Sequence, residues 1–93
     1  MSKTAIFIAE GFEEIEALTV VDLLRRAKID IRMISVSDSL SVTGSHGITV
    51  QCDAFFGSVD FAELEMIILP GGLPGTTNLE AFSPLMEQIR EFD

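Results

Sequence analysis

The sequence is poor in several features, and each shortage narrows what the chain can be. It has one cysteine, no tryptophan, no tyrosine, and only 6 basic residues against 15 acidic ones, for a formal charge of −9. A single cysteine cannot form an internal disulfide, so nothing indicates an oxidising compartment. The scarcity of lysine and arginine disfavours nucleic acid and anionic membranes as partners, because both are bound mainly through basic side chains.

Long apolar runs and targeting segments are also missing. No stretch approaches the roughly 20 apolar residues that span a bilayer, and residues 1–4 lead into a short apolar segment without a signal-peptide pattern. We therefore expect a cytoplasmic protein with no membrane contact. Hydrophobic residues make up 47% of the 93 residues, which is typical of a folded core and not of a disordered segment.

The order of patterns along the chain predicts an α/β fold. Residues 4–9 are a strand-like apolar run, residues 12–27 favour a helix, and residues 29–36 alternate as a second strand. This order predicts a right-handed βαβ unit.

The remaining patterns predict a hairpin, two short segments and a final helix. Residues 42–50 predict the hairpin, residues 61–64 a short helical turn, and residues 66–69 another parallel strand. A Ser-Pro pair predicts a helix over residues 84–92. No strand pattern follows this helix, so we expect the chain to be one incomplete or unusually small domain.

The first helix opens with three carboxylates. Acidic residues in a first turn are favoured by the helix dipole, which accounts for Glu13 and Glu14. Glu16 differs because its helical neighbours Phe12 and Val20 are apolar, and a carboxylate in an apolar stripe costs free energy unless it is paired or protonated. It also follows a strand end, where open α/β sheets bind ligands. A functional and a structural role are both open.

The same helix carries apolar residues on more than one side, with Ile15, Leu18 and Val21 on one and Val20 and Leu23 on another. A helix that is apolar on several faces is buried on several faces. We expect a second subunit to cover one of them and the isolated chain to associate. A covering layer from further sequence is the alternative.

Glycines follow the strand at residues 66–69, in the sequence Pro70-Gly71-Gly72-Leu73-Pro74-Gly75. Such a loop lets backbone N–H groups approach an anion or a developing oxyanion. It is not a phosphate loop, because it lacks the lysine of a Walker A motif and the G-x-G-x-x-G spacing. A tight strand-to-helix turn without a ligand is the open alternative.

These two motifs together resemble the ThiJ/PfpI family. The resemblance rests on Gly11-x-Glu13-Glu14-x-Glu16 with the run from Asp22 to Ala27, on Ile67-Ile68-Leu69-Pro70-Gly71-Gly72, and on Asp53-Ala54. It covers essentially the whole chain and is closest to the parkinsonism-linked deglycase subgroup and bacterial relatives named for thiazole biosynthesis. It implies a flavodoxin-like, class I glutamine-amidotransferase-like three-layer sandwich, usually homodimeric, of which residues 1–93 would be the N-terminal half.

The resemblance also implies a cysteine nucleophile on a strand-to-helix elbow in a second half. A glutamate matching Glu16 would support its thiolate, a backbone N–H matching Gly72 would contribute to the oxyanion site, and Gly71 would shape the turn. His46 would line the site from a neighbouring subunit and Arg26 would border a dimer-facing rim. The plainer interpretation of His46 is an exposed turn residue, and that of Arg26 is a solvated helix end. No cofactor and no metal are implied.

The sequence departs from the family pattern at three places. It ends at Asp93, about where the strand leading to the nucleophile would begin. Cys52 follows an alternating segment with no elbow, so we interpret it as a small structural residue. Lys28 stands where relatives commonly place a helix-ending glycine.

The resemblance gives two functional hypotheses. The intact protein is expected to be a cysteine-dependent hydrolase or lyase that acts on small carbonyl compounds or glyoxal adducts, deglycase- or glyoxalase-like. A redox-sensing or chaperone-type dimer linked to oxidative stress is the alternative. The 93 residues alone are expected to be inactive, because they lack the nucleophile.

Overall fold

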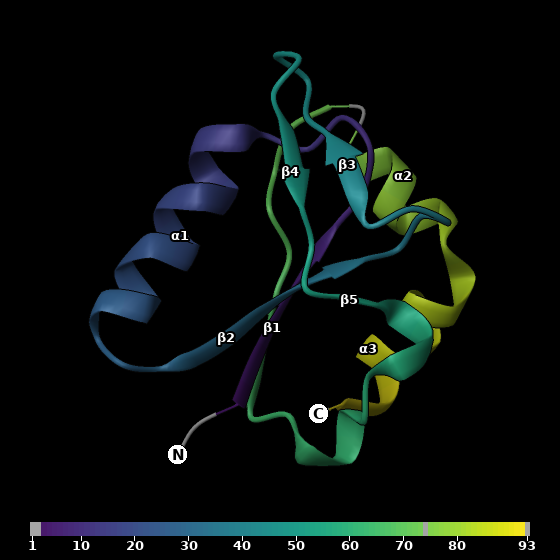
Figure 1. Cartoon of the computed structure of the whole chain (residues 1–93). Helices are drawn as coiled ribbons and strands as arrows, with labels where there is room; N and C mark the ends of the chain where they lie inside the picture. Colours follow the sequence, from purple (N-terminus) through teal and green to yellow (C-terminus); the bar gives the residue numbers. More distant parts are fainter. Residues whose placement is uncertain (1–2, 74, 93) are drawn as a thin grey trace.

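The computed structural model describes residues 3–73 and 75–92 and has three layers (Figure 1). A sheet forms the middle layer, with the strand order β5-β2-β1-β6 and each neighbouring pair parallel. Its strands are β1 (Lys3–Ile8), β2 (Asp30–Ser35), β5 (Ala54–Phe55) and β6 (Met66–Ile68). The helix α1 (Glu14–Arg26) connects β1 to β2 and completes the predicted βαβ unit.

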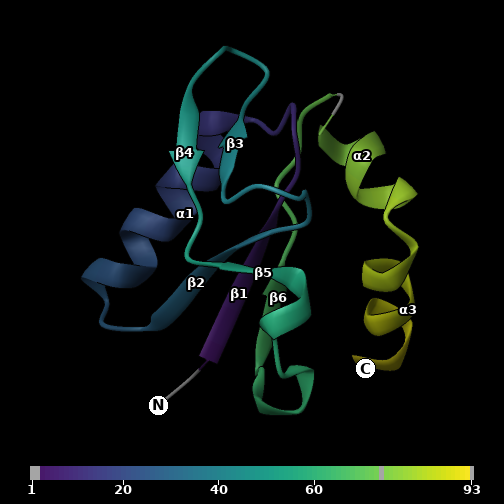
Figure 2. The ribbon, with the colours of Figure 1, turned by 45° about the vertical axis from the view of Figure 1, so that its right-hand side comes forward.

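The outer layers lie on opposite faces of the sheet (Figure 2). One holds α1 and an antiparallel hairpin, which lies beside the first turn of α1 and consists of β3 (Ser41–Thr43) and β4 (Thr49–Gln51). The other holds α2 (Gly75–Ala81), α3 (Ser83–Phe92) and the short 3-10 turns η1 (Phe56–Ser58) and η2 (Phe61–Glu63). The predicted three-layer α/β fold is therefore confirmed.

The strand β1 is buried on both faces, which explains its uninterrupted apolar run. Ile6 and Ile8 pack in the core beneath α1, whereas Ala5 and Phe7 pack in the core beneath α2 and α3. The Phe7 ring stacks on that of Phe61 with 5.7 Å between their centroids. A central parallel strand needs apolar residues at successive positions because it has no solvent-facing side.

The sequence patterns predict neither β5 nor α2. β5 is two residues long, and so short a segment has no periodicity to recognise. α2 has the sequence Gly-Thr-Thr-Asn-Leu-Glu-Ala, whose first four residues are poor helix formers. Its Leu79 is only 3% exposed, so packing against the sheet holds a helix that local propensity does not favour.

The end of α1 places a non-glycine residue in the left-handed region. Lys28 has φ +62°, and its N–H donates to the Arg25 carbonyl at 3.0 Å. This conformation costs an L-residue about 1 kcal/mol relative to glycine. The next residue, Ile29, donates to the Leu24 carbonyl at 2.9 Å, and the chain then enters β2. A glycine at this position would adopt the same conformation without that cost.

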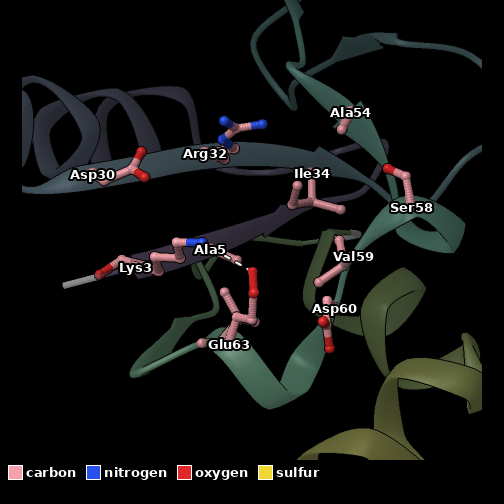
Figure 3. Close-up of a pocket in the computed structure, with 12 residues that line it drawn as sticks. Lys3, Ala5, Asp30, Arg32, Ile34, Ala54, Ser58, Val59, Asp60 and Glu63 are labelled. Atoms are coloured by element: carbon pink, nitrogen blue, oxygen red, sulfur yellow. Dashed lines mark hydrogen bonds and ion pairs between the residues drawn. The ribbon is translucent and has the colours of Figure 1, made fainter. Parts of the chain in front are cut away.

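A cavity of about 260 Å³ lies at the amino-terminal ends of β1 and β2 (Figure 3). Charged side chains line much of it, and an ion pair of 2.9 Å joins Lys3 to Glu63 there. Parallel sheets bind ligands at the opposite, carboxyl-terminal edge, where Glu16 and the glycine loop are predicted to meet. None of the described helices is long and apolar enough to cross a bilayer.

Candidate functional site

The loops that follow β1 and β6 meet at the carboxyl-terminal edge of the sheet, because the two strands are parallel neighbours. Glu16, in the first turn of α1, accepts a hydrogen bond from the Gly71 N–H through Oε1 at 3.0 Å. The Glu13 N–H donates to the Gly71 carbonyl at 3.1 Å. The structure therefore brings the two sequence motifs into contact, although Glu16 and Gly71 lie 55 residues apart in the chain.

Gly71 and Gly72 are both required by the geometry of this loop. Gly72 has φ +97°, a conformation that residues with a Cβ rarely adopt. A Cβ on Gly71 would lie 2.6 Å from Glu16 Oε1, and one on Gly72 would lie 2.9 Å from the Glu13 backbone nitrogen. Among the described residues, no acceptor takes the Gly72 N–H. The loop thus presents a backbone donor one residue from the Glu16 contact.

Glu16 is exposed, so the expectation that it lies in a buried apolar stripe is wrong. Leu23, on the same side of the helix, is 58% exposed. The side of α1 that packs on the sheet carries Ala17 and Val21 instead. Glu16 Oε2 has no hydrogen-bond partner within the described part of the chain. One carboxylate oxygen is therefore anchored by the glycine loop and the other is accessible.

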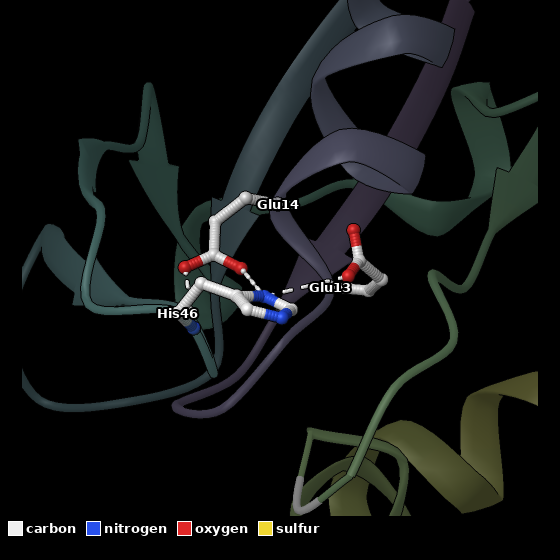
Figure 4. Close-up of side chains that lie close together, drawn as sticks. All are labelled: Glu13, Glu14 and His46. Atoms are coloured by element: carbon white, nitrogen blue, oxygen red, sulfur yellow. Dashed lines mark hydrogen bonds and ion pairs between the residues drawn. The ribbon is translucent and has the colours of Figure 1, made fainter.

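The buried carboxylate of α1 is Glu14, whose side chain is 2% exposed (Figure 4). Its Oε2 accepts the backbone N–H groups of His46 at 2.8 Å and Ile48 at 3.1 Å, and its Oε1 lies 3.0 Å from His46 Nδ1. Burial alone would raise the pKa of Glu14. The hydrogen bonds from His46 and Ile48 outweigh burial and lower that pKa to about 2. The interpretation of Glu14 as an ordinary first-turn acid is therefore wrong.

Glu13 caps α1. Its Oε1 accepts the N–H of Ile15 at 2.7 Å and that of Glu16 at 3.3 Å. Glutamate is not among the preferred capping residues, so the sequence gives little sign of this role. The cap fixes the backbone of Glu16 while the Glu13 N–H holds Gly71, so one residue positions both parts of the Glu16–Gly71 contact.

His46 lies on the turn of the β3–β4 hairpin, and its side chain is 68% exposed. Its Nδ1 also lies 3.5 Å from Glu13 Oε2. The hydrogen bond to Glu14, followed by the charges of Glu14 and Glu13, raises the pKa of His46. Within residues 3–73 and 75–92, His46 contacts neither Glu16 nor Gly71 through a hydrogen bond or ion pair.

Arg26 and Cys52 lie away from the Glu16–Gly71 contact. Arg26 ends α1 and pairs with Asp22 at 3.0 Å, with its side chain 76% exposed. Cys52 is buried, and burial, with a smaller contribution from Asp53, raises the pKa of its thiol to about 11. At neutral pH this thiol is protonated and inaccessible, which agrees with its interpretation as a structural residue.

Comparison with known proteins decides the family. The DJ-1/PfpI family profile matches residues 2–93. This chain belongs to the DJ-1/PfpI family. The ThiJ/PfpI resemblance read from the two motifs is thereby confirmed, together with the flavodoxin-like fold.

Three similar proteins illustrate the match. Protein DJ-1 homolog B of Arabidopsis thaliana is 34% identical over 91 residues, which are 98% of this chain and 21% of that protein. A deglycase of Thermococcus kodakarensis is 33% identical over 70 residues, which are 75% of this chain and 42% of the enzyme. The structure of a cysteine-to-alanine mutant of a DJ-1 superfamily protein from Salmonella typhimurium has a TM-score of 0.94 and 33% identity over 100% of this chain and 50% of that one. The chain thus spans half or less of these relatives.

The Glu14–His46 pair predicts a pH-dependent stability. Glu14 has a folded pKa of about 2 against 4.5 for the free group. Its contribution to the free energy of unfolding is therefore present above pH 4.5 and is lost as the pH falls towards 2. His46 has a folded pKa above 6.5. Its contribution to the free energy of unfolding is therefore complete below pH 6.5 and is lost as the pH rises through the folded pKa. The pair should therefore stabilise the fold most between pH 4.5 and 6.5.

Urea unfolding of the purified protein and of a His46→Ala variant, measured from pH 4.5 to alkaline pH, checks the expectation. The loss of stability in the variant should be greatest between pH 4.5 and 6.5 and should shrink at higher pH. Arg26→Ala is the matched control, because it removes a cation whose partner is exposed and should give a pH-independent effect. An equal loss for His46→Ala at every pH would contradict the assignment.

The burial of Cys52 leads to a second prediction, which concerns alkylation of its thiol. Because its thiol is buried and protonated, iodoacetamide at mildly alkaline pH should leave it unmodified in the folded protein and should modify it after denaturation. Peptide mass spectrometry localises the label, and a Ser41→Cys variant supplies an exposed thiol on β3 as the positive control. Labelling of Cys52 at the rate of that control would show that its thiol is accessible and would contradict the prediction.

Proposed function

We propose that this chain supplies the carboxylate and the backbone donor of a cysteine-dependent site in a longer DJ-1/PfpI protein. That protein would act on small carbonyl compounds or glyoxal adducts as a deglycase- or glyoxalase-like enzyme. The hydrogen bond from the Gly71 N–H to Glu16 Oε1, 3.0 Å long, carries the proposal. It anchors the carboxylate at the ligand-binding edge of the sheet and leaves Oε2 to face a thiol.

The proposed chemistry assigns one task to each group. The cysteine thiolate forms a carbon–sulfur bond with the carbonyl carbon, and the electron pair of the C=O bond moves to oxygen. The Gly72 N–H donates to that developing oxyanion. Glu16 takes up the proton of the thiol and delivers it to the oxygen as the adduct forms. Gly71 keeps Glu16 in place, because its N–H fixes one carboxylate oxygen.

The relatives support a cysteine and a carbonyl substrate. One similar protein is named a deglycase, and the similar solved structure carries a cysteine-to-alanine substitution. We propose that residues 1–93 form the N-terminal half of one domain, with the nucleophile in the second half, and that the chain alone is inactive. Its single cysteine is a buried free thiol, which is compatible with a reducing, cytoplasmic setting.

Glu16→Gln in the full-length protein tests the role of the carboxylate. A glutamine oxygen can still accept the Gly71 N–H, so the loop should stay in place while proton transfer is lost. We expect turnover of methylglyoxal or of its adducts to fall about 10²- to 10⁴-fold. The pKa of the nucleophilic thiol should also rise, because the variant no longer supports the thiolate.

Glu87→Gln, an exposed acid on α3, is the matched control and should leave both quantities unchanged. An unaltered rate and thiol titration in Glu16→Gln would reject the role of Glu16. No turnover by the wild type, combined with a thiol that oxidises readily under peroxide, would favour the redox-sensing alternative over the enzyme.

We also propose that the protein is a homodimer that uses the exposed face of α1. Three exposed apolar residues form the Ile15 patch. They are Ile15 (75% exposed), next to Glu14 in the chain, Leu18 (36%), one turn further along α1, and Ile48 (51%), whose N–H donates to Glu14 Oε2. Exposed apolar residues grouped around one buried residue in this way are typical of interaction surfaces. The proposed partner is a second copy of the same protein, because family members of this fold usually pair.

A charged substitution in the Ile15 patch tests the dimer. Ile15→Glu should shift the protein to a monomer in sedimentation velocity experiments, because burying the new carboxylate costs free energy. Ala62→Glu introduces the same charge at an exposed position of η2 and should leave the dimer intact. A wild type that sediments as a monomer, or equal behaviour of the two variants, would contradict this arrangement.

A further inference from the structure

A cluster at the start of α1 is not used by the proposed cysteine chemistry. Glu13, Glu14 and His46 each place one ligating atom within 4.8 Å of the other two (Figure 4). The imidazole contacts run from His46 Nδ1 to Glu13 Oε2 and to Glu14 Oε1. Two carboxylates and one imidazole are a donor set found in transition-metal sites.

The two carboxylates are oriented by bonds outside the cluster. Glu13 Oε1 accepts the N–H groups of Ile15 and Glu16, and Glu14 Oε2 accepts those of His46 and Ile48. In each carboxylate one oxygen is therefore held by the backbone while the other is directed at the imidazole. Outer hydrogen bonds of this kind orient ligands in metal centres.

The distances suit a small ion. Nδ1 of His46 lies 3.0 Å from Glu14 Oε1 and 3.5 Å from Glu13 Oε2. With ligand–metal distances of about 2.1 Å, these separations correspond to ligand–metal–ligand angles of about 90° and about 110°. We propose that Glu13, Glu14 and His46 form a three-ligand site for a divalent transition-metal ion such as Zn²⁺, with water completing the coordination.

Charge and ligand type select the ion. The imidazole favours Zn²⁺ and its neighbours in the first transition series over Ca²⁺ and Mg²⁺, which prefer oxygen ligands alone. The amino-terminal end of a helix opposes a cation, but two carboxylates offset this, and the N–H groups there point at Glu13 Oε1. His46 is largely exposed in the single chain, so its side of the site is open to solvent before the proposed dimer forms.

Metal titration of the full-length protein tests the site. After dialysis against a chelator, Zn²⁺ binding is measured by calorimetry, and Co²⁺ binding by visible absorption. We expect one saturable site per chain that involves His46, with the imidazole resonances of His46 shifting in step with calorimetric saturation. His46→Ala and Glu13→Gln should each weaken binding about tenfold or more. The Glu13→Gln side chain still offers an amide oxygen to cap α1, so its fold should be retained.

Two further variants separate this site from the cysteine site. Glu10→Gln removes the same charge from the neighbouring loop and should leave affinity within about twofold, since an exposed charge contributes little. Glu16→Gln should also leave Zn²⁺ affinity unchanged, whatever it does to turnover. Binding that is lost in Glu16→Gln but retained in His46→Ala would place the ion at the cysteine site and overturn the proposal. The absence of saturable binding would overturn it equally, leaving only an ion pair.

Discussion

The turn between β1 and α1, residues 10–13, is the constraint on which the rest of the site depends. Its backbone is bonded to two loops that are remote in sequence. The Gly11 N–H donates to the Thr43 carbonyl at 2.9 Å, on the hairpin, and the Glu13 N–H donates to the Gly71 carbonyl at 3.1 Å, after β6. Each bond satisfies a group that a tight turn leaves unpaired within its own segment. The glycine loop and the hairpin are thus positioned by the same four residues.

This arrangement gives the three glutamates at the start of α1 different physical roles. Glu13 caps the helix, Glu14 is buried beneath the hairpin, and Glu16 reaches the glycine loop. Burial of Glu14 is tolerated only because two backbone N–H groups and an imidazole replace the water that it loses. The hairpin that supplies these donors is consequently held against α1 by an ionised group, at a place where apolar packing is the common solution.

Much of the fold could be predicted because its main elements are long and locally consistent. The apolar run of β1, the uninterrupted helix α1 and the strand β6 before Pro70 each carry a periodic or compositional signal, and the structure agrees with all three. The two-residue β5 and the helix α2 carry none, because tertiary packing, as at Leu79, decides their conformation. Lys28 shows the reverse case, in which the fold imposes a left-handed conformation that the residue does not favour.

The site was less accessible to sequence reasoning than the fold. The motifs around Glu16 and Gly71 lie on two loops that the structure brings into contact, but helical periodicity placed the wrong glutamate in the core. The expectation for Glu16 rested on the apolar side of α1 that holds Phe12 and Val20. The sequence shows apolar residues on a second side as well, and α1 packs with its Ala17 side inward. The burial of Glu14 depends on His46 and Ile48, more than thirty residues away, so no local pattern reports it.

The topology also indicates where the proposed nucleophile would enter. In the described sheet, β6 pairs with β1 on one side and forms the edge on the other. A further strand parallel to β6 would end beside Pro70 and Gly72, close to the accessible oxygen of Glu16. The single cysteine of this chain lies in the core beneath α1, away from that position. An unpaired edge strand of apolar residues, such as β6, is a surface that proteins usually cover. Under the proposed function, the same added strand would complete the sheet and deliver the thiol.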